Sequence, residues 1–250
     1  MVDDRLGAPV RVGLVGLGSV CAAVHYPGLR LIPGVQIAGL CDVDPVLLAR
    51  RRQEWATGLA TTELGALLRR TPLDAVIIAT PNDTHRELVL EAVAAGCHVL
   101  CEKPLALDHA AAASMLHAAA AAGVRHMTAF TYRFAPGMRY LKHLVASGAL
   151  GEPRHARFQR LQYWGEKAIG WRQYRCRAGS GEIADMGIHR LDFAEDLLGP
   201  IRAVCGLTRR LLDRTEQRDG TRCAPQDSRT GPAGSRSSPA ARRACSRWAS

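Results

Sequence analysis

The segment Val10-Arg-Val-Gly-Leu-Val-Gly16-Leu-Gly18-Ser-Val-Cys21 joins an apolar run directly to a glycine turn. The run is typical of a buried strand, and the turn stands where a helix would begin. Gly16 permits a tight turn, and Gly18 lets a pyrophosphate group approach the backbone at the helix N-terminus. Cys21 occupies the third position of the glycine pattern and is small enough to keep helix and strand close. The segment therefore predicts a dinucleotide-binding unit.

Apolar runs and helical stretches alternate from this segment to Phe130. Short, fully apolar strands separated by helices are typical of a parallel sheet that is covered on both faces. The pattern predicts an α/β protein with an N-terminal, doubly wound Rossmann domain over residues 1–130. We expect its strands at 10–15, 35–41, 75–79, 99–101 and 126–130, and its helices at 19–31, 45–56, 63–70, 83–95 and 108–122.

A different pattern follows over residues 131–212, and it predicts a partial α+β domain built on an open sheet. A short helix, two strand-like runs, an irregular loop and a longer helix can be distinguished. We expect a helix from Pro136 to about Gly148, a strand at 154–164, a loop at 165–181, a helix at 181–198 and a strand at 201–207.

The last segment, 213–250, contains no Leu, Ile, Val, Phe, Met or Tyr. Such a composition cannot bury enough apolar surface to offset the entropy lost on ordering, so we expect a disordered basic tail. The change is abrupt and follows an incomplete sheet domain. Our hypothesis is that a frameshift or similar truncation replaced the true C-terminus, and a natural flexible tail is the alternative.

Charge and composition exclude several classes of partner. The net charge is +10, but residues 201–250 carry 11 arginines and four acidic residues, so the folded part is close to neutral. Nucleic acid is therefore not an expected partner. The sequence has no run of about 18 apolar residues to span a membrane, and its N-terminus does not resemble a signal peptide, which predicts a cytoplasmic protein. The eight cysteines include no Cys-x-x-Cys pair, so no metal site is expected.

An acidic residue ends the second expected strand. Asp42 lies 24 residues after Gly18, where a carboxylate can hydrogen-bond the hydroxyl groups of an adenosine ribose. Asp42 or Asp44 can also cap the helix that begins at Pro45, and the two roles can coexist. An acid at this position disfavours a 2′-phosphate, so NAD is the predicted cofactor and NADP is the alternative.

Two polar loops follow the third and fourth expected strands. The first is Thr80-Pro81-Asn82-Asp83-Thr84-His85, and the second is Glu102-Lys103-Pro104. Ligands of an open α/β sheet bind at the carboxyl ends of its strands. We therefore expect Asn82 and His85 beside the ribose and nicotinamide of the cofactor, and Lys103 beside the nicotinamide ring. The alternatives are a helix cap in the first loop and an ordinary turn lysine in the second.

The helix expected at 181–198 carries an acid and a histidine at a helical spacing. Asp185 and His189 are four residues apart, so on an α-helix they face the same side. Histidine titrates near neutrality and can accept the proton of an alcohol while hydride leaves the carbon. Asp185 then hydrogen-bonds the substrate or tunes His189. The alternative is an Asp–His pair on the surface.

These motifs, in this order, resemble those of the glucose–fructose oxidoreductase / inositol dehydrogenase / rhizopine catabolism (Gfo/Idh/MocA) family. The similarity covers roughly residues 10–208, and Trp171-Arg172 before the glycine-rich turn at 179–181 also fits the family pattern. The resemblance implies a Rossmann domain and an open-sheet domain, the latter apparently truncated here. It also implies an NAD(P)-dependent oxidoreductase of sugars, inositols or related polyols. A cofactor-binding regulator, or an inactive truncated remnant of such an enzyme, is the alternative.

The resemblance also implies roles for individual residues. Lys103, Asp185 and His189 form the expected catalytic group, in which His189 moves the proton, Lys103 positions the hydroxyl and lowers its pKa, and Asp185 orients them. Cofactor contacts are expected from Gly16, Gly18, Ser19, Val20, Asp42, Thr80, Pro81, Asn82, His85, Glu102 and Lys103. Substrate contacts are expected from Arg133, Trp171 and Arg172, while Tyr132 and Trp164 either join them or belong to the core. The family further implies a homo-oligomer.

Overall fold

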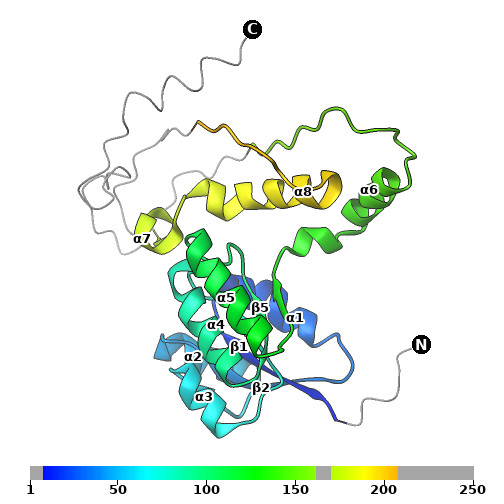
Figure 1. Cartoon of the computed structure of the whole chain (residues 1–250). Helices are drawn as coiled ribbons and strands as arrows, with labels where there is room; N and C mark the ends of the chain where they lie inside the picture. The colour runs from blue at the N-terminus through cyan, green and yellow to red at the C-terminus, as the bar shows by residue number, and fades with distance from the viewer. Residues whose placement is uncertain (1–7, 162–169, 208–250) are drawn as a thin grey trace, which may run out of the picture.

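The computed structural model describes residues 8–161 and 170–207 (Figure 1). Its strands are β1 Val10–Val15, β2 Val35–Cys41, β3 Ala60–Thr61, β4 Ala75–Ile78, β5 His98–Cys101 and β6 His126–Thr128. Its α-helices are α1 Tyr26–Leu29, α2 Pro45–Glu54, α3 Leu64–Arg70, α4 His85–Ala94, α5 His109–Ala121, α6 Pro136–Ala146, α7 Arg175–Ala178 and α8 Ile188–Leu198. Two π-helical segments, η1 Cys21–His25 and η5 Ile183–Gly187, and three 3₁₀ segments, η2 Asn82–Thr84, η3 Thr131–Phe134 and η4 Trp171–Gln173, complete the set.

The strands form one six-stranded sheet in the order β3-β2-β1-β4-β5-β6, and every neighbouring pair is parallel. The chain starts in the middle at β1, winds outward to β3, and returns to the other side of β1 with β4. This topology confirms the predicted doubly wound Rossmann domain. The strand order reverses between β1 and β4, so a crevice opens at their carboxyl ends. The sequence did not predict β3, because two residues are too few to give an alternating pattern.

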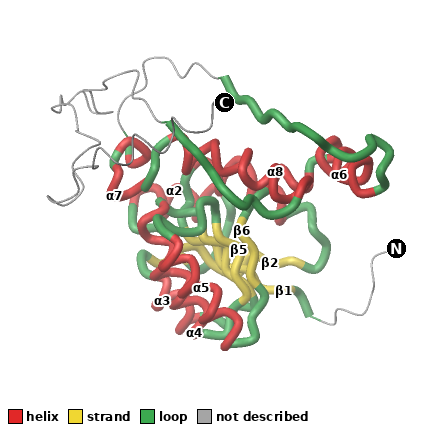
Figure 2. The backbone as a smooth tube through the Cα atoms, turned by 45° about the horizontal axis from the view of Figure 1, so that its top comes forward, coloured by secondary structure: helices red, strands yellow, loops and turns green. Residues whose placement is uncertain are grey.

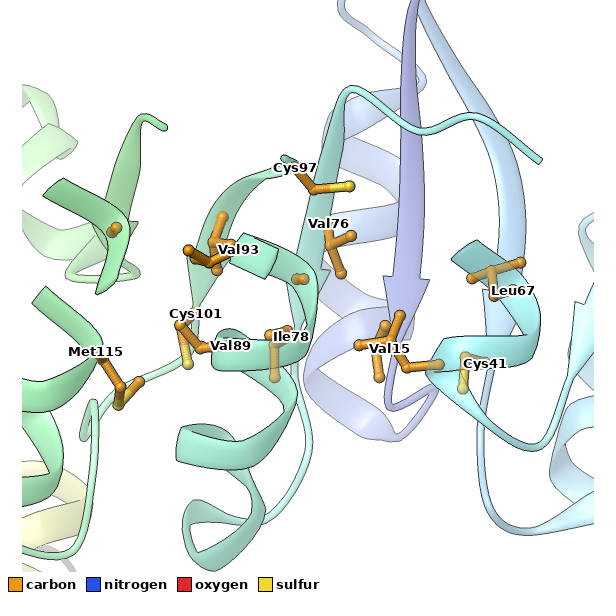
Figure 3. Close-up of a cluster of buried hydrophobic side chains, with 14 residues drawn as sticks. Val15, Cys41, Leu67, Val76, Ile78, Val89, Val93, Cys97, Cys101 and Met115 are labelled. Atoms are coloured by element: carbon orange, nitrogen blue, oxygen red, sulfur yellow. The ribbon is translucent and has the colours of Figure 1, made fainter. Parts of the chain in front are cut away.

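Helices cover both faces of the sheet. Figure 2 shows α3, α4 and α5 together on one side of the strands. The core on that side contains Val76 and Ile78 of β4 together with side chains from the three helices (Figure 3). Ile77 points to the opposite face, where it packs with Cys21 of η1 and Leu48 of α2. The alternation along β4 therefore buries both faces, as a parallel sheet requires.

The part of the chain after Phe130, called the second half below, forms helices and no strand among its described residues. The helix expected at 136–148 is α6, and the one expected at 181–198 is η5 followed by α8. The strand predictions are wrong for residues 154–161 and 201–207, which have no strand conformation. A strand is stabilised by a hydrogen-bonded neighbour, and neither segment pairs with a described strand. The rest of the first expected strand and the expected tail lie outside the described residues.

None of the described helices has the length and apolar character that crossing a bilayer requires. Helix α7 lies against η2, which follows β4 at the carboxyl edge of the sheet. The amide of Asn82 in η2 donates to the carbonyl oxygen of Ala178 in α7 at 3.1 Å. This edge is therefore covered by residues that lie far away in the sequence.

Candidate active site

One cleft collects most of the residues that the sequence motifs indicated. It has a volume of about 760 Å³ and lies at the carboxyl ends of β1, β2, β4 and β5. From the expected cofactor set, it is lined by Gly16, Gly18, Ser19, Val20, Asp42, Thr80, Pro81, Asn82, Glu102 and Lys103. The second half of the chain contributes Trp171, Arg172, Arg177 and Asp185. His85, Arg133 and His189 do not line the cleft.

The two glycines of the turn have different surroundings. Gly16 has a φ of +82°, and a Cβ there would lie 2.7 Å from the carbonyl carbon and oxygen of Ala79. A side chain at this position is therefore excluded by both conformation and space. A Cβ on Gly18 would meet no atom of the chain within 4 Å. Gly18 thus leaves its backbone open to the cleft, as the close approach of a phosphate group requires.

The carboxylate of Asp42 holds the glycine turn. Its Oδ2 accepts the N–H of Leu17 at 2.7 Å, and its Oδ1 accepts the N–H of Asp44 at 2.9 Å. Asp44 is the helix cap, because its side chain accepts the N–H groups of Val46 and Leu47 at the start of α2. The alternatives for the two acids are thus separated: Asp44 caps α2, while Asp42 faces the cleft and braces the turn.

His85 hydrogen-bonds to the loop after β4 and to the loop after β5. Its ring is fully buried, with Nδ1 3.0 Å from the carbonyl oxygen of Pro104 and Nε2 3.0 Å from that of Thr80. Both nitrogens therefore face backbone of the chain itself. The arrangement fixes the loop after β4 against the loop after β5, which carries Lys103.

Lys103 and Asp185 meet at the cleft. The Nζ of Lys103 donates to the Oδ1 of Asp185 at 2.8 Å and to its backbone carbonyl oxygen at 2.5 Å. The Nε of Arg172 lies 3.5 Å from Oδ2 of the same carboxylate. Burial raises the pKa of Asp185, but the hydrogen bond and charge of Lys103, aided by Arg172, outweigh it and hold the pKa below its usual value. The carboxyl group of Asp185 is therefore ionised near neutral pH.

His189 is buried between aromatic rings one turn beyond Asp185. Its ring is edge-on to Tyr132 at 4.7 Å and to Phe130 at 6.0 Å between centroids. Burial, followed by the positive charges of Lys103 and Arg190, lowers the pKa of His189 to about 4. At neutral pH the ring is therefore uncharged and able to accept a proton. Its Nδ1 has no hydrogen-bond partner among the described residues.

The helix carrying these two residues is not a regular α-helix at this point. Residues Ile183–Gly187 are π-helical, and the N–H of Ile188 donates to the carbonyl oxygen of Ile183. The helix expected at 181–198 is therefore present, but its segment 183–187 is π-helical rather than α-helical. Asp185 lines the cleft, whereas His189 packs against Tyr132 and Phe130. Spacing in the sequence could not reveal this widened turn.

Arg133 is engaged with the chain itself. Its guanidinium donates hydrogen bonds to the buried carboxylate of Asp192: Nε lies 2.9 Å from both oxygens, and Nη2 lies 2.5 Å from Oδ1. The hydrogen bond to Asp192 raises the pKa of Arg133. The bond joins η3 to α8 and thereby supports the turn that carries His189. Of the other expected substrate residues, Trp171 and Arg172 line the cleft, and Trp164 lies outside the described residues.

Sequence reasoning missed His25. This histidine ends η1, and its Nε2 lies 2.8 Å from Oε1 of Glu102, with both side chains buried. A lone histidine in a helical stretch carries no motif, so no signal in the sequence singled it out. Among the described residues, no group of three or more His, Cys, Asp or Glu side chains is placed to hold a metal ion.

The buried His189 predicts a pH dependence of stability. Between pH 6.5 and about 4 the ring gains a proton in the unfolded chain but stays neutral in the folded one. The unfolded state then binds more protons, so the free energy of unfolding falls by about 3 kcal/mol as pH falls through this window. Urea unfolding at pH 7 and pH 4.5 should show a smaller loss for His189→Gln than for the unaltered chain. Equal losses would contradict the assignment.

Two family descriptions match the chain. Residues 10–130 match the oxidoreductase family with an NAD-binding Rossmann fold, and residues 138–224 match the GFO/IDH/MocA C-terminal domain. The chain is 32% identical over 205 residues to levoglucosan dehydrogenase of Pseudarthrobacter phenanthrenivorans, covering 78% of this chain and 53% of that protein. It is 30% identical over 190 residues to myo-inositol 2-dehydrogenase of Thermotoga maritima, covering 76% and 55%.

Solved structures give the same result. A crystal structure of an oxidoreductase domain protein from Kribbella flavida superposes with a TM-score of 0.73 and 35% identity. The match covers 77% of this chain and 54% of that one. The chain thus spans about half the length of the curated relatives it matches.

Proposed function

This chain belongs to the Gfo/Idh/MocA oxidoreductase family. We propose that it is an NAD(P)-dependent oxidoreductase that acts on a hydroxyl group of a sugar, inositol or related polyol. The observation that carries the proposal is the contact between Lys103 and Asp185 at the same cleft as the glycine turn. A cation and a carboxylate beside a dinucleotide site suit the polarisation of an alcohol. The names of the relatives, levoglucosan dehydrogenase and myo-inositol 2-dehydrogenase, support the substrate class.

The cofactor would lie along the edge of β1, β2, β4 and β5. Gly18, Ser19 and Val20 would meet the pyrophosphate at the start of the helix, and Asp42 would accept hydrogen bonds from the adenosine ribose. The carboxylate of Asp42 disfavours a 2′-phosphate, which supports NAD over NADP. Thr80, Pro81, Asn82 and Glu102 would line the nicotinamide end. His85 would act from behind this surface, by holding its loops.

Charge and burial support the proposed catalytic roles. When bound, the nicotinamide ring supplies the hydride acceptor or donor. Lys103, held by Asp185, donates hydrogen bonds to the substrate oxygen and lowers the pKa of the hydroxyl group. His189, which is neutral at pH 7 but buried outside the lining of the cleft, would accept the hydroxyl proton in oxidation and return it in reduction where the substrate reaches its ring. Trp171 and Arg172 would contact the substrate, and Arg133 would act through Asp192. A homo-oligomer and a cytoplasmic location stay predictions.

Cofactor binding tests the proposal directly. NADH and NADPH are titrated into the purified chain, with nicotinamide fluorescence and thermal shift as readouts, and turnover is then measured with a panel of sugars and inositols. We expect tighter binding of NADH and NAD-dependent oxidation of at least one polyol. Binding without turnover would favour the alternative of a regulator or inactive remnant. Absence of any binding would contradict the proposal itself.

The two turn glycines give a matched pair of variants. Gly16→Ala should lower the free energy of unfolding by about 1–3 kcal/mol or more. Its backbone is in a left-handed conformation, and the new methyl group would clash with the backbone of Ala79. Gly18→Ala should leave the melting temperature unchanged, because its methyl group meets no atom of the chain. It should nevertheless weaken NADH binding at least about tenfold, since the methyl group occupies the approach of the pyrophosphate. Urea unfolding and fluorescence titration measure the two effects. If Gly18→Ala bound NADH with unchanged affinity, the pyrophosphate would not bind at Gly18.

A further inference from the structure

A buried polar contact joins the glycine-turn helix to the loop that carries Lys103. His25 and Glu102 are 7% and 8% exposed, and Nε2 of His25 lies 2.8 Å from Oε1 of Glu102. With its proton on Nε2, the ring of His25 donates to this carboxyl oxygen. The second oxygen, Oε2, accepts the backbone N–H of Lys103 at 3.2 Å. Glu102 is therefore held between the two residues.

This contact has consequences beyond packing. A buried carboxylate that loses its donor is costly, so His25 fixes the rotamer of Glu102. Glu102 in turn fixes the backbone at Lys103, whose Nζ reaches Asp185 at 2.8 Å. His25 also ends the helical segment that starts at the glycine turn, where the N–H of Ala22 donates to the carbonyl oxygen of Gly18. A continuous chain of contacts thus runs from the turn to Lys103.

We propose that His25 is a positioning residue, which sets the orientation of Lys103 through Glu102 and ties it to the helix after the glycine turn. The proposal rests on the function proposed above, because Lys103 is there the residue that contacts the substrate. It does not need His25 to touch either ligand. His25 is absent from the lining of the cleft, whereas Glu102 and Lys103 are part of it.

The lysine content of the chain allows a direct structural test. The sequence contains three lysines, Lys103, Lys142 and Lys167, so a chain labelled with ¹⁵N-lysine gives three backbone amide signals. Lys142→Arg and Lys167→Arg identify the signal of Lys103 by removing the other two. We expect His25→Leu to shift the Lys103 signal by more than its linewidth. His25→Gln, whose amide can still donate to Glu102, should keep the signal near its original position.

Kinetics supply the second readout. His25→Leu should lower kcat by about 10- to 100-fold, because a misaligned Lys103 loses its geometry toward the substrate oxygen. The substrate KM and the NADH dissociation constant should change little, and His25→Gln should recover most of the rate. Met115→Ala is the matched control, since it removes a buried side chain of α5 outside the cleft. It should lower the melting temperature without changing kcat or the Lys103 signal.

The outcomes separate this proposal from the one on which it rests. A Lys103 signal that stays unshifted in His25→Leu overturns the positioning role, whatever the activity. A shift and a loss of rate that Met115→Ala reproduces equally also overturn it, because the effect is then general destabilisation. If the unaltered chain binds no NADH and oxidises no polyol, the proposed function fails. The amide signal still decides whether His25 orients Lys103.

Discussion

Replacing Lys103 with alanine is expected to abolish turnover and to leave the affinity for NADH within a few-fold of its original value. Its Nζ lies 2.8 Å from Oδ1 of Asp185, nearer than any other cationic group among the described residues. Alanine removes the donor to the substrate oxygen, a loss of at least about 10³-fold in kcat. The proposed contacts of the cofactor with the glycine turn and Asp42 would be unaffected. Steady-state rates and fluorescence titration measure the two effects separately.

Lys142→Ala is the control for this variant. Lys142 pairs with Asp196 on the surface at 2.6 Å and is half exposed, so its removal costs at most about 1 kcal/mol of stability. It should leave kcat unchanged. Activity in Lys103→Ala equal to that of Lys142→Ala would remove Lys103 from the catalytic group. Loss of NADH binding in Lys103→Ala would instead make it a cofactor-binding residue.

Replacing His189 with asparagine is expected to lower kcat by about 10²–10⁴-fold, the range lost with a general base. Asparagine keeps a polar side chain of similar size but has no nitrogen that accepts a proton at neutral pH. The neutral state of His189 follows from its buried position and from the nearby charges of Lys103 and Arg190. Rates measured at saturating NAD and polyol separate this loss from any change in binding.

His143→Asn makes the same chemical change on the exposed face of α6. It should have no effect on kcat, which shows that asparagine itself is tolerated in the chain. A His189→Asn variant with a normal rate would assign the proton transfer to another group. A loss of rate that a basic buffer of small size restores would support the assignment, since such a base can replace the missing ring.

The Rossmann half could be predicted because its signals are local. The apolar run of β1, the turn at Gly16 and the cap at Asp44 each act within a few residues. The position of Lys103 followed from the same logic, since it directly follows a buried strand. That Lys103 meets Asp185 did not follow, because the two residues lie 82 positions apart. Only their shared resemblance to a family placed them together before the fold was known.

The second half could be predicted less well, because its features depend on distant partners. Residues 154–161 and 201–207 have strand-like composition, yet no described strand lies beside them. Arg133 carried no sequence signal for its partner, and the structure places its guanidinium on the buried Asp192. His25 presents the same difficulty, since its role depends on Glu102 on a different element. Local sequence patterns do not show which distant carboxyl group each of these side chains contacts.

Two π-helical segments adjoin residues of the site: η1 ends at His25 and η5 contains Asp185. Such a turn holds one residue more than an α-helical turn of the same height. Losing Met186 from this segment would make the helix regular and rotate everything before it, Asp185 included, by about 100° relative to α8. Every catalytic side chain would still be present, but Asp185 and His189 would no longer be aimed as they are. The site therefore depends on helix length as well as on residue identity, and point substitution alone cannot test that dependence.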